Sequence, residues 1–122
     1  MNDSYQFENL DAWKKAKELT ILVYQLLSKF PSHERFELCS QIRRASISVP
    51  SNIAEGSGRI SFKEKIHFLE IAYGSLMEIY CQLLIAVDLN YITNSDLEQI
   101  KPFVFDTSRL ISGLRRSYEA KL

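Results

Sequence analysis

Apolar residues recur at steps of three and four along four segments of the chain, and short breaks separate these segments. This spacing places apolar side chains on one face of an α-helix, whereas the strict alternation typical of a strand does not persist anywhere. The third segment is the most regular, because its apolar residues form a heptad seam of Phe62, Ile66, Leu69, Tyr73, Leu76, Tyr80, Leu83 and Val87. The sequence therefore predicts an all-α protein.

The breaks in this pattern predict four helices, over about 9–30, 34–57, 61–90 and 95–119. Asn9 is a candidate N-cap, Pro31 ends the first helix, and Ser61 with Glu64 forms a capping box, as does the run 94–98. Links of two to six residues make neighbouring helices antiparallel. We expect residues 1–122 to form one domain, an antiparallel up-down-up-down four-helix bundle.

Two prolines lie inside predicted helices. A proline there removes a hydrogen-bond donor at a cost of about 3 kcal/mol, so the second helix is either kinked at Val49–Pro50 or split in two. Pro102 either bends the fourth helix or marks its first turn. Polar residues near Pro50 are expected to satisfy the backbone groups that it frees, with a ligand site as the alternative; they are Ser48, Ser51, Asn52 and Glu55.

The third segment carries more apolar surface than one seam requires. The additional residues outside the seam are Phe68, Ile71, Ala72, Ile79, Leu84 and Ala86. A single bundle core is not expected to cover all of them, which favours association of several copies. The alternative is a well-packed monomer with one unusually apolar helix.

Composition and spacing argue against several functional classes. Fifteen basic residues balance fifteen acidic ones, so any nucleic-acid binding must come from local patches. Cys39 and Cys81 lack partners at metal-ligand spacing and are expected to fill the core, and His33 and His67 are far apart. No signal-peptide pattern follows Met1, and the apolar stretches look too short to span a membrane, which predicts a cytoplasmic protein without membrane association. We expect no enzyme, cofactor or metal site.

Charge is distributed unevenly between the two ends of the predicted bundle. One end collects Lys14, Lys15, Lys17, Arg59, Lys63, Lys65, Arg115, Arg116 and Lys121 against Asp3, Glu8, Asp11, Glu18, Glu55, Glu64 and Glu119, a net charge of +2. The other end has Lys29, Arg35 and Lys101 against Glu34, Glu37, Asp88, Asp96 and Glu98, a net charge of −2. The first end is a candidate phosphate-binding surface, and the alternative is that its charges are simply solvated.

Arg43 and Arg44 are adjacent on a helix, so their side chains diverge by about 100°. We expect one of them to pair with a carboxylate such as Glu70 or Glu78 on a facing helix. The other is expected to face a neighbouring molecule or nucleic acid.

The stretch Gln41–Arg59 resembles the signature of the 23S rRNA intervening-sequence proteins, also called the S23 or four-helix-bundle family. Phe7–Leu10 with Trp13, and Phe68–Glu78, agree with this resemblance, whereas Cys39 replaces the Thr or Ser more usual in the family. The signature residues singled out here are Arg43, Arg44, Pro50, Asn52, Glu55 and Gly56.

The resemblance implies a family that is named for reading frames within 23S rRNA gene insertions and whose biochemical role is unsettled. A related group serves diversity-generating retroelements as a pentamer thought to bind nucleic acid and a reverse transcriptase. The expected function is thus a non-catalytic homopentameric scaffold for structured RNA or DNA, with reverse transcriptase as a further partner in a retroelement; a protein–protein adaptor is the alternative. The candidate nucleic-acid contacts are Arg43, Arg44, Arg59, Lys63, Lys65, Arg115 and Arg116.

Overall fold

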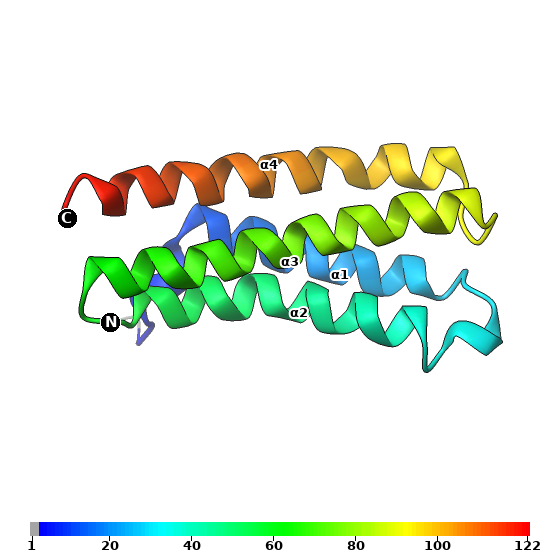
Figure 1. The fold of residues 1–122 in the computed structure, drawn as a ribbon, viewed down its shortest axis with the longest axis horizontal. Helices are drawn as coiled ribbons and strands as arrows, with labels where there is room; N and C mark the ends of the chain where they lie inside the picture. The colour runs from blue at the N-terminus through cyan, green and yellow to red at the C-terminus, as the bar shows by residue number, and fades with distance from the viewer. Residues whose placement is uncertain (1–2) are drawn as a thin grey trace.

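The computed structural model describes residues 3–122 as four antiparallel helices (Figure 1). Met1 and Asn2, which belong to the predicted domain and to the amino-terminal stretch considered above, lie outside the described residues. The helices are α1 (Asp11–Leu27), α2 (Leu38–Ser57), α3 (Phe62–Asp88) and α4 (Asn94–Glu119). Two short 3-10 helices, η1 (Gln6–Asn9) and η2 (Ser32–Glu34), precede α1 and α2. The predicted all-α class and four-helix bundle are confirmed.

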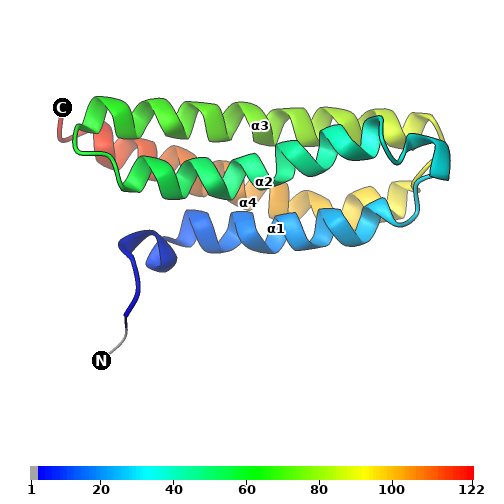
Figure 2. The same cartoon turned by 90° about the horizontal axis from the view of Figure 1, so that it is seen from below.

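Each helix packs against its two neighbours in the order α1, α2, α3, α4 and back to α1. Within residues 3–122, no backbone contacts join α1 to α3 or α2 to α4, so these pairs occupy diagonal corners. Figures 1 and 2 show the same arrangement from two sides, with the α2–α3 turn and the end of α4 at one end of the bundle. The exposed faces of α1 and α3 therefore point in opposite directions.

The core forms along the centre of the bundle from small and branched apolar side chains. In α3 the fully inward positions are Ile66, Leu69, Ala72, Leu76, Ile79, Leu83 and Ala86. The predicted seam is thus rotated slightly, because Ala72, Ile79 and Ala86 take core positions while Tyr73 is 38% exposed. Some of the apolar residues that were predicted to lie outside the seam therefore belong to the core. Ile71 and Leu84, however, remain 38% and 42% exposed.

The helix starts differ from the predicted caps in three places. α1 begins at Asp11 after Leu10, which offers no side-chain cap, and η1 takes up the residues around Asn9. At α3, Ser61 Oγ accepts the Glu64 N–H as predicted, but the Glu64 carboxylate does not return a bond to the Ser61 N–H. At α4 the capping box lies one residue earlier than predicted, with Thr93 and Asp96 as partners. Side-chain oxygens thus cap α3 and α4, whereas α1 begins without a side-chain cap.

Asp96 combines this cap with an ion pair to α1. Its carboxylate accepts the Thr93 N–H at 2.9 Å and contacts Lys29 Nζ at 2.6 Å. The Lys29 ammonium and then the Thr93 N–H lower the pKa of Asp96 below its ordinary value. Because the folded pKa is the lower one, this stabilisation is present above the unfolded pKa of about 4 and is lost as the pH falls below it.

We expect Lys29→Met to lower the melting temperature at pH 7, and to lower it less as the pH falls from about 4 toward about 2, because protonation of Asp96 removes its attraction to Lys29. Thermal unfolding followed by circular dichroism between these pH values provides the test. A difference between the variant and the parent protein that stays constant with pH would contradict the assignment.

Pro50 lies inside a continuous α2, so the helix is not split. A proline at this position leaves the carbonyl of Ser46, four residues earlier, without its helical donor. Thr20 of α1 supplies the donor, because its Oγ1 lies 2.9 Å from the Ser46 carbonyl oxygen. The same Oγ1 also lies 2.9 Å from the carbonyl oxygen of Ala16, one turn earlier in α1. The polar residues expected to perform this task do not: Asn52 bonds to Ser48 instead.

Pro102 likewise lies within a helix, since α4 begins two turns earlier at Asn94. It therefore does not mark the first turn of α4. Pro102 is exposed, as is Glu98, whose carbonyl it leaves without a helical donor, so water can reach that group.

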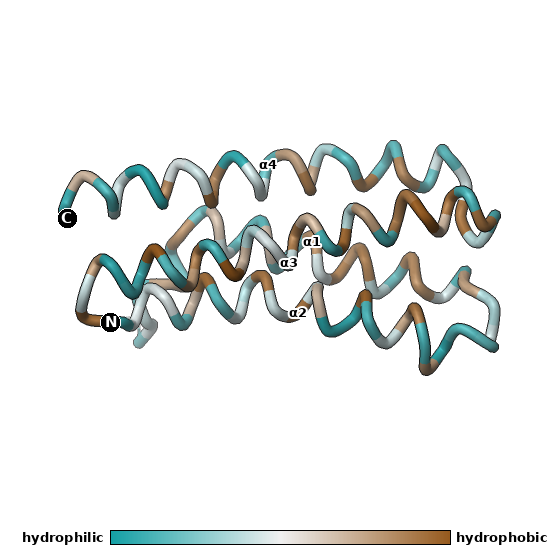
Figure 3. The backbone as a smooth tube through the Cα atoms, viewed as in Figure 1, coloured by the Kyte–Doolittle hydropathy of each residue, from teal (hydrophilic) through white to brown (hydrophobic). Residues whose placement is uncertain are grey.

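Among the helices of residues 3–122, α3 is long and apolar enough to meet the length and composition criteria for a membrane span. Figure 3 shows apolar segments recurring along its whole length. This differs from the expectation that every apolar stretch is too short. A core helix of a bundle meets the same criteria, and α3 packs against both α2 and α4.

Candidate nucleic-acid interface

The antiparallel order brings the end of α2, the start of α3 and the end of α4 to one end of the bundle (Figure 1). We call this surface the basic end; its cations are Arg59, Lys63, Lys65, Arg115, Arg116 and Lys121. The acids on the same three helix ends are Glu55, Glu64 and Glu119, so the net charge is +3. Chain topology therefore concentrates positive charge in a protein whose formal net charge is zero.

Gly56 allows the close approach of α2 and α3 at this end. It is buried, and a Cβ atom there would lie 3.0 Å from Phe68 Cβ and 3.2 Å from the Lys65 carbonyl oxygen. Both distances are shorter than ordinary carbon contacts, so only glycine fits without displacement. Glycine at this position therefore lets α2 and α3 pack closely beside the turn that joins them.

Lys65 closes the end of α2 rather than pointing into solvent. Its Nζ donates to the Ser57 carbonyl at 2.7 Å and lies 5.7 Å and 5.6 Å from the ring centroids of Phe62 and Tyr118. Lysine at a helix C-terminus satisfies a free carbonyl and complements the helix dipole. Burial raises the pKa of the Tyr118 phenol, so Tyr118 stays neutral beside the ammonium. Lys65 thus has a structural role, which weakens its candidacy as a phosphate ligand.

Two arginines of the basic end are paired with carboxylates. Arg59 contacts Glu55 at 2.5 Å and lies 4.5 Å from the Phe68 ring centroid. Arg115 contacts Glu119 at 3.2 Å and Glu70 of α3 at 3.7 Å. The side chains in these pairs are all at least 40% exposed. Exposed ion pairs contribute only about 0–1 kcal/mol to stability, so phosphate can compete with the carboxylates for the arginines.

Three cations of the basic end have no carboxylate within 4.0 Å in residues 3–122, namely Lys63, Arg116 and Lys121. All three are exposed. Beside them Ile60, at the α2–α3 turn, is 96% exposed. Ile60 was not predicted as part of this surface, although an isoleucine in a Gly- and Ser-containing turn, outside every apolar stripe, was an available signal.

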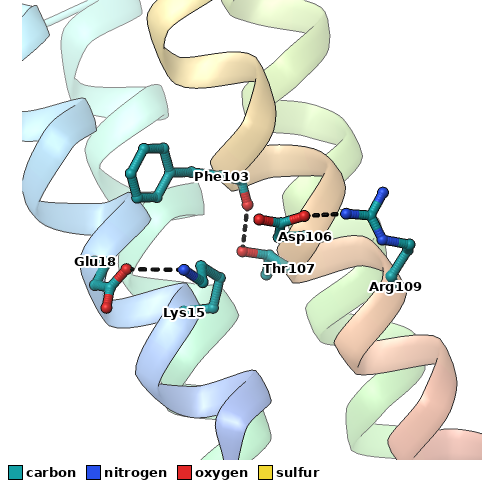
Figure 4. A network of polar contacts seen from close by, with 6 residues as sticks. All are labelled: Lys15, Glu18, Phe103, Asp106, Thr107 and Arg109. Carbon is teal, nitrogen blue, oxygen red and sulfur yellow. Dashed lines mark hydrogen bonds and ion pairs between the residues drawn. The ribbon is translucent and has the colours of Figure 1, made fainter.

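The lysines of α1 do not belong to the basic end. α1 has 17 residues and α3 has 27, so α1 starts well inside the bundle (Figure 2). Figure 4 shows Lys15 beside Phe103 of α4, and its Nζ lies 5.3 Å from that ring centroid. Phe103 precedes Arg116 by 13 residues, or about 20 Å along the helix. The predicted cluster was wrong for Lys15 and for Lys14 and Lys17 in the same stretch of helix, because α1 is ten residues shorter than α3 and begins well inside the bundle.

Arg43 and Arg44 also lie away from the basic end, in the first half of α2. Arg43 donates to the Arg35 carbonyl at 2.9 Å, so it holds the η2–α2 link and pairs with neither Glu70 nor Glu78. Arg44 is exposed and lines a polar groove of about 480 Å³ between α2 and α3, which Glu78 also lines. The structure therefore does not bring these two candidates together with Lys63 and Arg116.

The cysteines and histidines have separate surroundings in the described residues. Within the described part of the chain, no three His, Cys, Asp or Glu side chains form a metal-binding group. Cys39 is buried as expected, whereas Cys81 is exposed. His33 Nε2 lies 3.3 Å from the Tyr91 hydroxyl, and His67 packs against Phe68. The two histidines therefore have different neighbours and do not contact each other.

The protein-family comparison matches residues 8–113 to the 23S rRNA-intervening sequence protein family. Among solved structures, a protein of unknown function from the S23 ribosomal protein family of Bacteroides thetaiotaomicron superposes with a TM-score of 0.76 and 23% sequence identity. The superposition covers 85% of this chain and 97% of that protein, which supports the bundle fold. A comparison with curated protein sequences gives no significant match. The chain belongs to the 23S rRNA-intervening sequence protein family.

Proposed function

We propose that this protein is a non-catalytic oligomeric scaffold that binds structured RNA or DNA through its basic end. The observation that carries the proposal is the placement of Lys63, Arg116 and Lys121 on one end, exposed and without carboxylate partners in residues 3–122. Positive groups of this kind bind phosphates without reading sequence, because they release counterions on contact. The expected ligand is therefore a folded polyanion rather than a particular base sequence.

The oligomeric part of the proposal rests on family resemblance and on uncovered apolar surface. The resemblance implies a homopentamer, and several large apolar side chains of α3 are 38–46% exposed. A ring of copies would repeat the basic end around its axis. Repetition multiplies weak phosphate contacts, so a modest charge on each copy is sufficient for avid binding.

Reversing two free cations should weaken binding strongly. In Lys63→Glu with Arg116→Glu, each protomer loses two positive contacts and gains two repulsive ones. We expect affinity for a hairpin RNA or a duplex DNA of about 30 nucleotides to fall at least tenfold at 50 mM salt. The slope of log affinity against log salt should decrease by about two or more. Electrophoretic mobility shift over a salt series measures both quantities.

The matched control is Arg35→Glu, the same kind of reversal at the opposite, acidic end, where Arg35 makes no ion pair within the described residues. The affinity of this variant for RNA or DNA should be close to that of the parent protein, apart from the small decrease caused by its more negative net charge. Equal loss in both variants would indicate only a nonspecific response to charge. A parent protein that shifts neither probe at low salt would overturn nucleic-acid binding.

The alternative function is a protein–protein adaptor that binds no nucleic acid. The exposed apolar face of α3 favours it, because large exposed apolar patches mark interaction surfaces. In that case the basic end would be solvated charge, and the scaffold would still assemble. A reverse transcriptase is the partner that the retroelement relationship suggests, and co-purification of such an enzyme with the parent protein but not with an α3 variant would favour this function.

A further inference from the structure

Ile60 lies on the α2–α3 turn and projects from the basic end. It is 96% exposed, more than any other large apolar residue within residues 3–122. Figures 1 and 2 show this turn at the same end of the bundle as the end of α4. Phe62 and Tyr118, the aromatic residues on these two helix ends, are partly buried because their rings pack together, with centroids 5.8 Å apart. Ile60 therefore stands apart from the apolar surface of the helices.

Hydrogen bonds hold the chain on both sides of Ile60. The Arg59 N–H donates to the Gly56 carbonyl at 3.1 Å, and Ser61 Oγ accepts the Glu64 N–H at 3.1 Å. Isoleucine is β-branched and has few rotamers, so fixing its side chain in a bound position costs little conformational entropy. The turn thus presents a short, stiff apolar side chain in a defined place.

Ile60 shares the basic end with exposed positive groups. Three of the cations there are exposed and have no carboxylate within 4.0 Å in residues 3–122, namely Lys63, Arg116 and Lys121. A ligand that fits this combination carries negative charge on its outside and apolar surface that a narrow side chain can reach. Nucleic acids have this chemistry, because phosphates line the edges of a stack of flat bases.

Other partners fit this surface less well. The centre of a protein–protein interface is a group of large apolar side chains with few charges, whereas here one isoleucine lies on a basic surface. A membrane requires more apolar area than Ile60 offers, since even one myristoyl chain gives only marginal binding. Nucleic acid is therefore the ligand that both the charge and the single apolar side chain favour.

We propose that Ile60 is an apolar wedge that enters gaps in the base stack of a bound nucleic acid, while the neighbouring cations hold the phosphates. Isoleucine is one of the side chains that proteins insert between base steps. Opening a fully stacked step costs free energy, and this cost is lowest where a base is missing, mismatched or unpaired. One isoleucine is therefore expected to enter interrupted helices and to leave continuous ones intact.

This inference rests on the proposed function and adds selectivity to it. The cations bind any folded polyanion, because their contacts with phosphates do not depend on the bases. Ile60 carries no charge, so it changes which nucleic acid is preferred without changing how binding depends on salt. The two contributions can therefore be separated in one set of measurements.

Two DNA duplexes of equal length and charge test the wedge. One is continuous, and the other has a single abasic site at its centre with 2-aminopurine as the adjacent base. We expect the parent protein to bind the abasic duplex about tenfold more tightly, which is the effect of burying one isoleucine side chain. Binding should also raise the 2-aminopurine fluorescence, because the inserted side chain unstacks this base.

Ile60→Ser removes the wedge and leaves every charge in place. This variant should bind both duplexes with the affinity that the parent has for the continuous one, and with the same slope of log affinity against log salt. Ile60→Leu should keep the preference, because leucine is also an effective wedge. Phe36→Ser is the matched control, since Phe36 is an 80% exposed apolar residue at the opposite end, and it should bind both duplexes like the parent.

A parent protein that binds both duplexes equally would overturn the wedge and leave the proposed function standing. A preference that persists in Ile60→Ser, without loss of the fluorescence change, would do the same. A parent that binds neither duplex at low salt would overturn the proposed function together with the wedge. Vesicles of anionic phospholipid test the remaining surface: binding that requires Ile60, in a protein without preference between the duplexes, would assign this side chain to a membrane instead.

Discussion

Gly56→Ala is expected to lower the free energy of unfolding by about 1–3 kcal/mol, although alanine is normally the better helix former. The added Cβ would meet Phe68 Cβ at 3.0 Å and the Lys65 carbonyl oxygen at 3.2 Å. Both atoms belong to or sit next to the backbone of α3, so relief requires α2 and α3 to move apart. That movement would also disturb the turn that carries Arg59 and Ile60.

The matched control is Gly113→Ala in α4. There the new Cβ would meet only the end of the Arg116 side chain, at 3.7 Å, so the helix gains rigidity without a clash. We expect Gly113→Ala to stabilise the protein by about 0.5–1 kcal/mol. Urea unfolding at fixed protein concentration measures both variants. Stabilisation of both would show that α2 and α3 are not held as closely as the structure places them.

Thr20→Val is expected to cost about 1–3 kcal/mol, because it leaves the Ser46 carbonyl without a donor inside the bundle. Valine has nearly the shape of threonine, so the loss reports the hydroxyl rather than packing. Thr20 is 8% exposed and Ser46 1% exposed, which leaves water little access to the carbonyl. Chemical denaturation gives the difference between the variant and the parent.

Pro50→Ala provides the second half of a double-mutant cycle. Alanine restores the N–H that can donate to the Ser46 carbonyl, so Thr20→Val should cost less in the Pro50→Ala background than in the parent protein. The difference between the two costs measures the coupling of Thr20 to Pro50. Equal costs in both backgrounds would mean that Thr20 stabilises the fold through its bond to Ala16 alone.

The sequence predicted the fold class and the four-helix architecture, because the spacing of apolar residues follows directly from helix geometry. It predicted the inward face of α3 less accurately. Ala72 and Ile79 form the core there, while Tyr73 is 38% exposed. Periodicity marks every apolar stripe on a helix, but only the neighbouring helices decide which of two adjacent stripes is buried.

Predictions made from neighbouring residues were wrong at two places in the first two helices. The polar residues near Pro50 looked able to satisfy the freed carbonyl, yet the donor is Thr20, 26 residues away from Ser46. α1 begins at Asp11 rather than at about residue 9, and Asn9, the predicted N-cap, belongs to η1, which contains the cap between Tyr5 and Glu8. The contact between Thr20 and Ser46 cannot be deduced from neighbouring residues, whereas the cap between Tyr5 and Glu8 is a local contact that the spacing of apolar residues does not reveal.

The candidate site was predictable to the extent that it depends on topology. Antiparallel connections bring the α2–α3 turn next to the end of α4, so Lys63 and Arg116 share one end as predicted. Helix lengths and side-chain partners are not apparent from the pattern. For that reason Lys15 was misplaced and the capping role of Lys65 was missed.

The opposite charges of the two ends give the protein a permanent electric dipole along its long axis. The basic end carries +3 and the opposite end −2, across helices of up to 27 residues, or roughly 40 Å. A polyanion therefore exerts a torque on the molecule as well as an attraction. At physiological salt this torque acts over about 8–10 Å, so it turns the basic end toward the polyanion in the last nanometre of approach.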